Sequence, residues 1–213
     1  MWRNPQIGAF ALKLHYAGAS PFTRKVMVVL HETGQLGDVE IIDTALSPLA
    51  APKDYRAKNP LSKLPALERP DGPSLYDSRV ICAYLDDRGN GGLYPDGNAR
   101  WDMLVLEATA DGIMEAGVLM VYEARFRPED KQWSDWVDAQ WSKASGAIKA
   151  LNDRWISQLT GSLDMGQIAV ACALGYIDLR HADRNWRDGN DALAAWYGEF
   201  ETRDSMVATR PPA

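Results

Sequence analysis

The chain has few of the residue types that build disulfide frameworks and metal centres. Among its 213 residues are two cysteines, Cys82 and Cys172, and three histidines. Neither set has the close spacing of a metal-binding motif, and two distant cysteines exclude a disulfide-stapled fold. We therefore expect no metal ion. We expect the histidines to be surface or capping residues: His15, His31 and His181.

The chain also lacks a basic excess and a long apolar run. Its 23 Lys and Arg against 29 Asp and Glu give a net charge of −6. Nucleic acid and anionic membrane surfaces are therefore not expected as partners. No stretch approaches the ~20 apolar residues of a membrane-spanning helix. The first residues lack the basic start and apolar core of a signal peptide, which predicts a cytoplasmic protein.

The first part of the chain has the alternating and helical hydrophobic patterns of an α/β domain. Gly34 stands where the first helix should end, and a Pro-Asp-Gly turn separates two short strands. The predicted order is β-α-β-α-β-β-α, over 12–17, 21–33, 39–43, 45–63, 64–68, 74–76 and 77–88.

The second part of the chain has no strand pattern. A Gly-, Asn- and Pro-rich linker over 89–99 precedes it, whereas residues 1–11 have no clear period and are expected to be a loose lead-in. Apolar residues at steps of three and four then predict an all-helical domain. Its helices are expected at 100–126, 133–156, 163–181 and 191–203.

Two local features of these helices predict packing and a start signal. Gly112 and Gly117 lie inside a helix, where glycine costs about 1 kcal/mol against alanine, so they indicate close packing or a bend. Asp164 can cap the third helix while Gln167 reaches back to the backbone of the cap, with Leu163 and Ile168 placed to form a hydrophobic staple.

Four motifs, in this order, resemble segments of the cytosolic glutathione transferases. They are SPFTRKV (20–26), NPLSKLPAL (59–67), LYDSRVICAYL (75–85) and LDMGQIAVACALGYIDLR (163–180). EATADGIMEAG and FETRDSMVATRPP look most like a bacterial Ser-type subgroup with poorly defined substrates.

The resemblance implies a thioredoxin-like glutathione-binding domain over 12–88, the linker, an all-helical transferase domain over 100–208, and a homodimer. The chain departs from the family pattern at Ser62, usually Gly, at Asp77, usually Glu, and in its Asp-x-x-Gln cap.

Glutathione, the implied co-substrate, must ionise its thiol before it attacks an electrophile. A free thiol has a pKa near ~8.5, and lowering it by about two units takes roughly 2.7 kcal/mol. The resemblance assigns this task to Ser20, just before a helix that Pro21 begins, and makes Phe22 a neighbouring contact. Ser followed by Pro is also a favoured helix start, so a purely capping Ser20 remains the alternative.

The other motifs imply contacts along the tripeptide. Leu64-Pro65 resembles the family's cis-proline site, where the Leu64 backbone pairs with the cysteinyl part of the ligand. Asp77 would face the γ-glutamyl ammonium, and Ser78 at a helix start would hold the adjacent carboxylate. Lys63 either pairs with the glycyl carboxylate or is a solvated loop lysine.

The electrophile would bind between the domains, against the helix at 100–126. The candidates for lining this pocket are Met114, Glu115, Leu119 and Tyr122. Asp111 on the same helix is a candidate for reaching the glutathione of a partner subunit.

The favoured function is glutathione transfer to a small apolar electrophile, with no cofactor beyond glutathione. A thiol-disulfide oxidoreductase is disfavoured, because the hydroxyls of Ser20 and Thr23 cannot form a mixed disulfide. A glutathione-dependent peroxidase and a non-enzymatic glutathione-binding or interaction module remain open alternatives.

Overall fold

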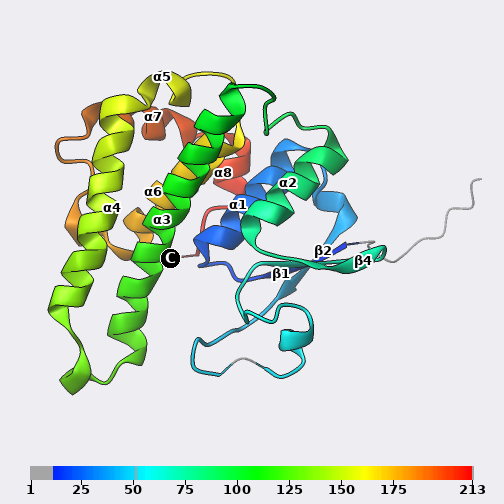
Figure 1. The fold of residues 1–213 in the computed structure, drawn as a ribbon, viewed down its shortest axis with the longest axis horizontal. Helices are drawn as coiled ribbons and strands as arrows, with labels where there is room; N and C mark the ends of the chain where they lie inside the picture. Colours follow the sequence, from blue (N-terminus) through cyan, green and yellow to red (C-terminus); the bar gives the residue numbers. More distant parts are fainter. Residues whose placement is uncertain (1–11, 51, 213) are drawn as a thin grey trace, which may run out of the picture.

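The computed structural model describes residues 12–50 and 52–212, so the predicted lead-in at 1–11 lies outside the described residues. The chain forms a four-stranded sheet with helices on one side and a larger helical domain beside it (Figure 1). The strand order is β2-β1-β3-β4. β1 is parallel to β2 and antiparallel to β3, which is antiparallel to β4. The predicted α/β and all-α architecture is confirmed.

The elements of the first domain follow the predicted order. They are β1 (Leu12–Tyr16), α1 (Pro21–Glu32), η1 (Leu36–Asp38), β2 (Val39–Asp43), η2 (Tyr55–Ala57), β3 (Ala66–Arg69), β4 (Gly72–Leu75) and α2 (Ser78–Gly89). In place of the helix expected in 45–63, the described residues of this range, 45–50 and 52–63, form the 3₁₀ turn η2. Gly34 follows α1 with φ +66°, as its predicted stop position requires.

The second domain is helical throughout its described residues. Its elements are α3 (Ala99–Phe126), η3 (Glu129–Lys131), α4 (Ser134–Arg154), α5 (Ile156–Leu159), α6 (Met165–Arg180), η4 (Ala182–Arg184), α7 (Asp191–Phe200) and α8 (Asp204–Ala208). The patterns did not predict the two short helices α5 and α8. In the described residues, no helix is long and apolar enough to cross a membrane.

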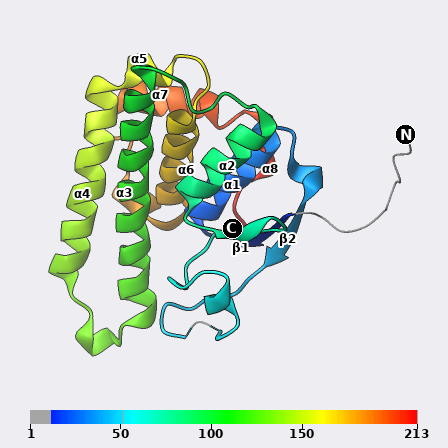
Figure 2. The same cartoon turned by 45° about the vertical axis from the view of Figure 1, so that its right-hand side comes forward.

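The core of the second domain is built around α6. This helix runs behind α3 and α4, which form a long antiparallel pair (Figures 1 and 2), and it is buried on every side. A Cβ on Gly117 would lie 3.1 Å from the Tyr176 ring. This confirms the packing predicted for Gly117, whereas a Cβ on Gly112 would meet nothing within 4 Å.

The cap of α6 is partly as predicted. Asp164 Oδ1 accepts a hydrogen bond from the Gln167 N–H at 2.9 Å. The Gln167 side chain does not reach back to the cap. Its Nε2 instead donates to the carbonyls of Gln158, Gly161 and Ser162 in the preceding turn. These carbonyls surround the Gln167 amide because the chain turns just before the cap, and the capping motif alone does not predict such contacts.

The expectation that the histidines are surface or capping residues was wrong for His15. Its ring is buried and hydrogen-bonds Thr44 Oγ1 at 3.0 Å and Glu68 Oε1 at 2.7 Å. His181 is the C-cap residue of α6, but it too is buried, against the Gly117 carbonyl at 2.9 Å. Polar partners from distant segments make these burials possible.

Candidate functional site

Three of the predicted motifs meet at one edge of the sheet. β1 ends next to the start of β3, because His15 pairs with Ala66, and β4 ends next to the same point, because Leu75 pairs with Leu67. The segment that begins α1, the segment before β3 and the segment that begins α2 therefore share this edge. Figure 1 shows α1 and α2 side by side above the sheet. Both helices begin at this edge, so their positive ends lie there together.

Ser20 is the N-cap of α1, and its Oγ accepts from the Thr23 N–H at 3.4 Å. This contact is long for a hydrogen bond. The Thr23 hydroxyl is buried and donates to the carbonyls of Ala17, at 2.8 Å, and Ser20, at 3.0 Å. The Thr23 hydroxyl thus uses its proton to hydrogen-bond the loop before α1. The Ser20 hydroxyl only accepts in this turn, so it can still donate a hydrogen bond to a ligand. Phe22 is half-buried against the core.

The segment before β3 presents backbone groups of Leu64. The Leu64–Pro65 peptide bond is cis, as the motif predicted. In the described part of the chain, neither the N–H nor the C=O of Leu64 has a hydrogen-bond partner. Leu64 is half-buried. With its backbone donor and acceptor both free, Leu64 can pair with an extended peptide as a neighbouring β-strand would.

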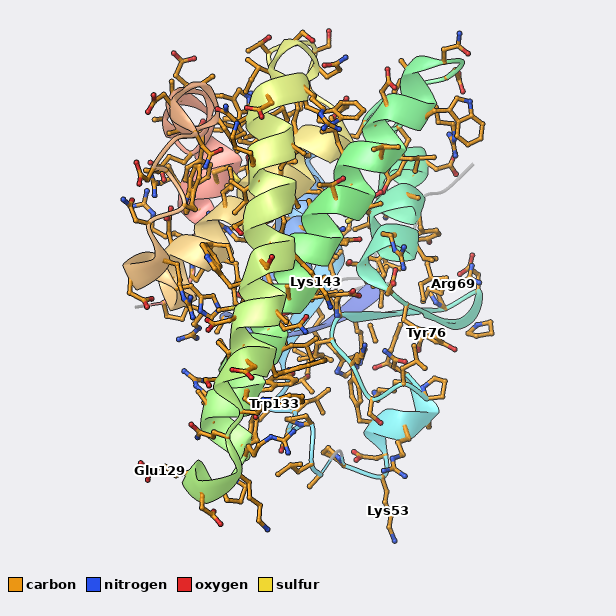
Figure 3. All side chains as sticks on the ribbon, turned by 60° about the vertical axis from the view of Figure 1, so that its left-hand side comes forward. Lys53, Arg69, Tyr76, Glu129, Trp133 and Lys143 are labelled. Carbon is orange, nitrogen blue, oxygen red and sulfur yellow. The ribbon has the colours of Figure 1, made fainter. Side chains whose placement is uncertain are left out.

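Asp77 and Ser78 begin α2. Asp77 caps the helix through the Arg79 N–H at 3.1 Å and also pairs with the Arg79 guanidinium at 2.8 Å. Burial alone would raise the pKa of Asp77, but the hydrogen bond and charge of Arg79 outweigh it and lower that pKa. Ser78 is buried at the first position of the helix. The Tyr76–Asp77 bond is also cis, which nothing in the sequence indicated. Figure 3 places Tyr76 where the sheet passes into α2.

A buried cluster of charges lies between the two domains. Lys25 of α1 is fully buried, and its Nζ lies 3.0 Å from Glu107 Oε1 and 2.7 Å from Asp111 Oδ1 on α3. Burial by itself lowers the pKa of Lys25, but the two carboxylates outweigh it and raise that pKa. Asp111 also lies 3.6 Å from Arg79. In this chain Asp111 thus faces its own first domain, and its expected reach to a partner subunit stays a prediction.

The predicted electrophile pocket is only partly consistent with the structure. Met114 has no exposed surface and belongs to the core, so placing it on a pocket wall was wrong. Glu115, Leu119 and Tyr122 are exposed and lie at i, i+4 and i+7 on α3. Met114 is one residue, about 100° of helix rotation, away from this stripe and therefore faces the core.

The end of the chain comes back to the loop before Ser20. A Cβ on Gly18 would lie 3.2 Å from Pro212 Cδ and 3.3 Å from the Tyr16 hydroxyl. Figure 1 shows this end beside the start of α1. The sequence analysis predicted no tail residue at this site, because residues 18 and 212 are far apart in the chain and no sequence pattern connects them.

The thiols of the chain are not available for chemistry at this site. Cys82 and Cys172 are free and fully buried. Burial raises the pKa of Cys172 to about 11 and that of Cys82 well above its usual value. A reactive thiol is exposed and has a low pKa, so neither cysteine is a candidate nucleophile.

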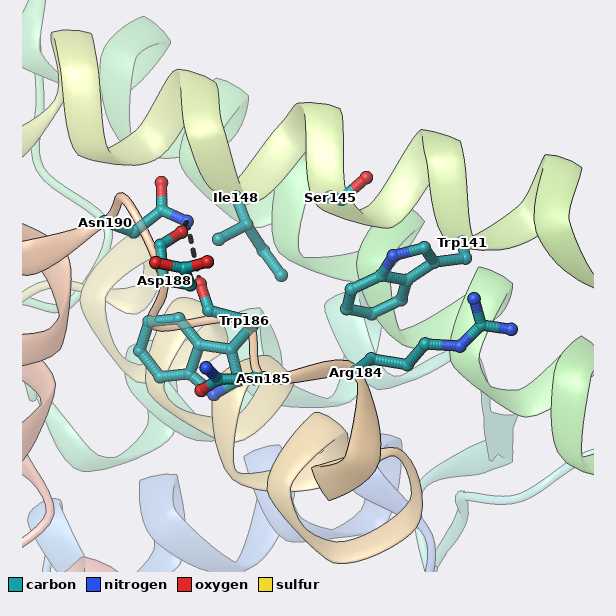
Figure 4. A pocket seen from close by; sticks show the side chains of 8 residues that line it. All are labelled: Trp141, Ser145, Ile148, Arg184, Asn185, Trp186, Asp188 and Asn190. Carbon is teal, nitrogen blue, oxygen red and sulfur yellow. Dashed lines mark hydrogen bonds between the residues drawn. The ribbon is translucent and has the colours of Figure 1, made fainter.

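A cavity of about 220 Å³ lies elsewhere, against α4 and the η4 region (Figure 4). None of the predicted site residues lines it. Its walls are Trp141, Ser145, Ile148, Arg184, Asn185, Trp186, Asp188 and Asn190. In the described ranges there is no cluster of three or more His, Cys, Asp or Glu side chains that suits a metal ion.

Comparison with known proteins identifies the two domains. Residues 19–88 match the model of the glutathione S-transferase N-terminal domain, and residues 134–199 match that of the C-terminal domain. The uncharacterized GST-like protein YibF of Escherichia coli is 30% identical over 205 residues, which cover 94% of this chain and 99% of that protein.

Solved structures give the same result. A glutathione transferase family member from Pseudomonas fluorescens, with bound glutathione, is 49% identical and has a TM-score of 0.91, covering 95% of this chain and 100% of that one. A second structure from that organism holds S-(propanoic acid)-glutathione, with 49% identity, a TM-score of 0.87 and coverage of 94% and 100%. A glutathione-bound transferase from Methylobacillus flagellatus is 35% identical, with a TM-score of 0.82 and coverage of 94% and 100%. The chain belongs to the glutathione S-transferase family.

Proposed function

We propose that the protein is a glutathione transferase that ionises the thiol of bound glutathione and directs it at a small electrophile. The observation that carries this proposal is the meeting of Ser20, Leu64 and Ser78 at one sheet edge. A hydroxyl, an unpaired strand-like backbone and a helix N-terminus suit a thiol, a peptide and a carboxylate.

Ser20 is proposed to donate a hydrogen bond from its hydroxyl to the thiolate, while the proton stays on the Ser20 oxygen. It stands at the positive end of the 12-residue α1, where an anion is favoured by about 0.3–1 kcal/mol. A charge-assisted hydrogen bond adds about 1.5–3 kcal/mol. Together these are of the size needed to lower a thiol pKa by about two units. The long contact from Thr23 leaves the Ser20 hydroxyl free to turn toward a ligand.

Recognition of the rest of the tripeptide is proposed for the predicted residues around Ser20. Leu64, before Pro65, pairs with the cysteinyl backbone, and Ser78 at the start of α2 holds the γ-glutamyl carboxylate. Asp77 faces the γ-glutamyl ammonium of glutathione, so the Asp77 side chain would bind both this ammonium and the Arg79 guanidinium. Lys63 is exposed and free to meet the glycyl carboxylate.

The electrophile is proposed to meet the thiolate in front of α3, against Glu115, Leu119 and Tyr122. The thiol releases its proton to solvent, and the sulfur then bonds to an electrophilic carbon. It either displaces a leaving group, which departs with its bonding electron pair, or adds to a double bond, whose other carbon takes a proton from solvent. The Pseudomonas relative with bound S-(propanoic acid)-glutathione supports small electrophiles, including those that carry a carboxylate.

A homodimer is part of the proposal. The outer side of α3 carries Trp101 and Val105, one turn apart and 65% and 47% exposed. Such side chains are typical of a surface that a partner covers. Light scattering on the purified protein is expected to give twice the mass of the chain, and a monomeric mass would refute this part.

The test begins with glutathione binding, measured as retention on immobilised glutathione. The wild-type protein is expected to be retained, and a Ser78→Ala, Asp77→Ala double variant to be lost. Equal retention of both proteins would refute the assigned site.

Conjugation is then followed with a chloronitroaromatic and with acrylate, and the adducts are identified by mass. Binding with no conjugation to either would favour the binding module.

The role of Ser20 is tested separately from its capping. Ser20→Gly removes the hydroxyl but costs a helix start only a few tenths of a kcal/mol, and Ser20→Thr keeps both functions. In Ser20→Gly the apparent pKa of the pH–rate profile is expected to rise toward that of a free thiol, and Ser20→Thr to restore it. An unchanged profile in Ser20→Gly would return Ser20 to capping alone.

A further inference from the structure

The segment before Leu64 is held by two buried side chains to which the motifs assigned no role. The Tyr55 hydroxyl donates to the Lys63 carbonyl at 2.9 Å, and Asn59 Nδ2 donates to the same carbonyl at 2.7 Å. Tyr55 is 3% exposed and Asn59 is 1% exposed. Both lone pairs of one carbonyl are thus occupied by donors from the protein interior.

The Lys63 carbonyl matters because of the group at the other end of its peptide bond. The bond between Lys63 and Leu64 is trans, and the carbonyl of residue 63 and the N–H of residue 64 lie in one plane and point in opposite directions. Donors that fix the carbonyl therefore also fix the direction of the Leu64 N–H. That N–H is the one left without a partner within the described residues.

Both donors are themselves fixed. Asn59 Oδ1 accepts from the Leu61 N–H at 2.9 Å, which leaves Nδ2 as the group that faces Lys63. The Tyr55 ring packs edge-on against His15 of β1, with the ring centroids 5.4 Å apart. His15 is held in turn by Thr44 and Glu68. Burial raises the pKa of Tyr55, so its hydroxyl stays protonated and remains a donor.

This support replaces regular secondary structure. In its described residues, the long connection between β2 and β3 contains one 3₁₀ turn and an isolated bridge between Ser47 and Ala50. Lys53 on this connection points away from the rest of the molecule (Figure 3). Without side chains that tie its last residues to the sheet, the peptide that ends at Leu64 would be free to rotate.

We propose that Tyr55 and Asn59 are positioning residues for glutathione, which by holding the Lys63 carbonyl aim the Leu64 N–H at the cysteinyl carbonyl of the ligand. This inference rests on the proposed function. It adds that the affinity for the peptide part of glutathione depends on two side chains that do not touch it.

Two nearly isosteric variants test the proposal. Tyr55→Phe removes only the hydroxyl and keeps the ring against His15. Asn59→Asp keeps the acceptor for the Leu61 N–H but replaces the donor to Lys63 with a carboxylate oxygen. Tyr176→Phe is the matched control, because Tyr176 is a buried tyrosine of the helical domain whose hydroxyl has no hydrogen-bond partner in the described residues.

The readouts are the glutathione Kd from calorimetry, and KM and kcat for conjugation with their pH profiles. Tyr55→Phe is expected to raise Kd and the KM for glutathione about 3–10-fold, the effect of one lost hydrogen bond. Asn59→Asp is expected to raise them about tenfold or more, because two acceptors then face each other. The kcat at saturating glutathione and the apparent thiol pKa should stay unchanged, because Ser20 is untouched.

The outcomes separate this inference from the proposed function. A wild-type protein that does not bind glutathione refutes the proposed function. A wild-type protein that binds, with Tyr55→Phe and Asn59→Asp binding equally well, overturns the positioning inference alone. A fall in kcat at unchanged KM would also overturn it. If Asn59→Asp does not fold, Tyr55→Phe, compared with Tyr176→Phe, still decides the question.

Discussion

The buried ion cluster between the domains gives a strong prediction about stability. Replacing Lys25 with methionine keeps much of the side-chain volume and removes the charge that lies 3.0 Å from Glu107 and 2.7 Å from Asp111. Two carboxylates, 2% and 11% exposed, are then left without their main partner. Breaking a buried pair in this way typically costs 3–5 kcal/mol. We expect a loss near the middle of this range, because Tyr94 and Arg79 still contact the carboxylates.

Urea unfolding measures this loss directly. With a slope of about 2–3 kcal/mol per molar urea, a loss of about 4 kcal/mol moves the midpoint down by about 1.5 M. A Lys25→Met, Glu107→Gln double variant should recover part of the stability, because it no longer buries both carboxylates. A Lys25→Met variant that loses less than about 1 kcal/mol would refute the reasoning.

The pH dependence supplies an internal check on the same variant. Burial raises the pKa of Glu107, an effect that Lys25 opposes, so removing Lys25 raises that pKa further. A carboxyl with a raised folded-state pKa destabilises the fold above that pKa and has no such effect below its unfolded pKa of about 4.3. The deficit of Lys25→Met should therefore be largest near pH 7 and shrink as the pH falls. A deficit independent of pH would contradict an electrostatic cause.

Two further predictions concern Ser62 and Glu32. Ser62 has φ +54°, a backbone conformation that favours glycine. Ser62→Gly should therefore raise the unfolding free energy by about 0.5–1 kcal/mol and Tm by about 1–3 °C in a thermal melt. Ser62→Ala should give no such gain, and an equal gain in both variants would contradict backbone strain as the cause. Burial alone would raise the pKa of Glu32, but hydrogen bonds from Arg203 and Ser205 outweigh it and lower that pKa. Glu32→Gln should therefore cost about 1 kcal/mol at pH 7. Chemical unfolding at several pH values should show this cost fading as the pH falls below the usual glutamate pKa of about 4.3, whereas a cost that persists in strong acid would contradict the pairing.

The residues proposed to touch glutathione were predictable to different degrees. Leu64-Pro65 and Asp77-Ser78 stand in motifs that resemble those of the family, and this resemblance singled them out. The cis bond at Pro65 is as the resemblance predicted. Asn59 lies inside the same motif, but its role was missed. Its importance comes from the direction of a carbonyl four residues later, which depends on how the loop folds.

Sequence patterns were enough to predict the strands β1 to β4, the long helices and the division into two domains, but not the short helices α5 and α8. Hydrophobic periodicity and capping residues such as Ser20 and Asp164 act between neighbours in the chain, so they can be read without a fold. Met114 was assigned to the pocket without regard to this periodicity, and it lies in the core because one residue along a helix turns the side chain by about 100°.

The burial of two charged residues of α1 could not be predicted from the sequence, because it depends on contacts between distant segments. Arg24 and Lys25 are two adjacent basic residues, a type that is mostly exposed in proteins, yet both are buried. Lys25 donates to the carboxylates of Glu107 and Asp111, which lie 82 and 86 positions further along the chain. Arg24 donates to the carbonyl of Met206, which lies 182 positions further along. A charge is buried only where an opposite charge or a hydrogen-bond acceptor comes within reach. Such partners are set by how the two domains pack.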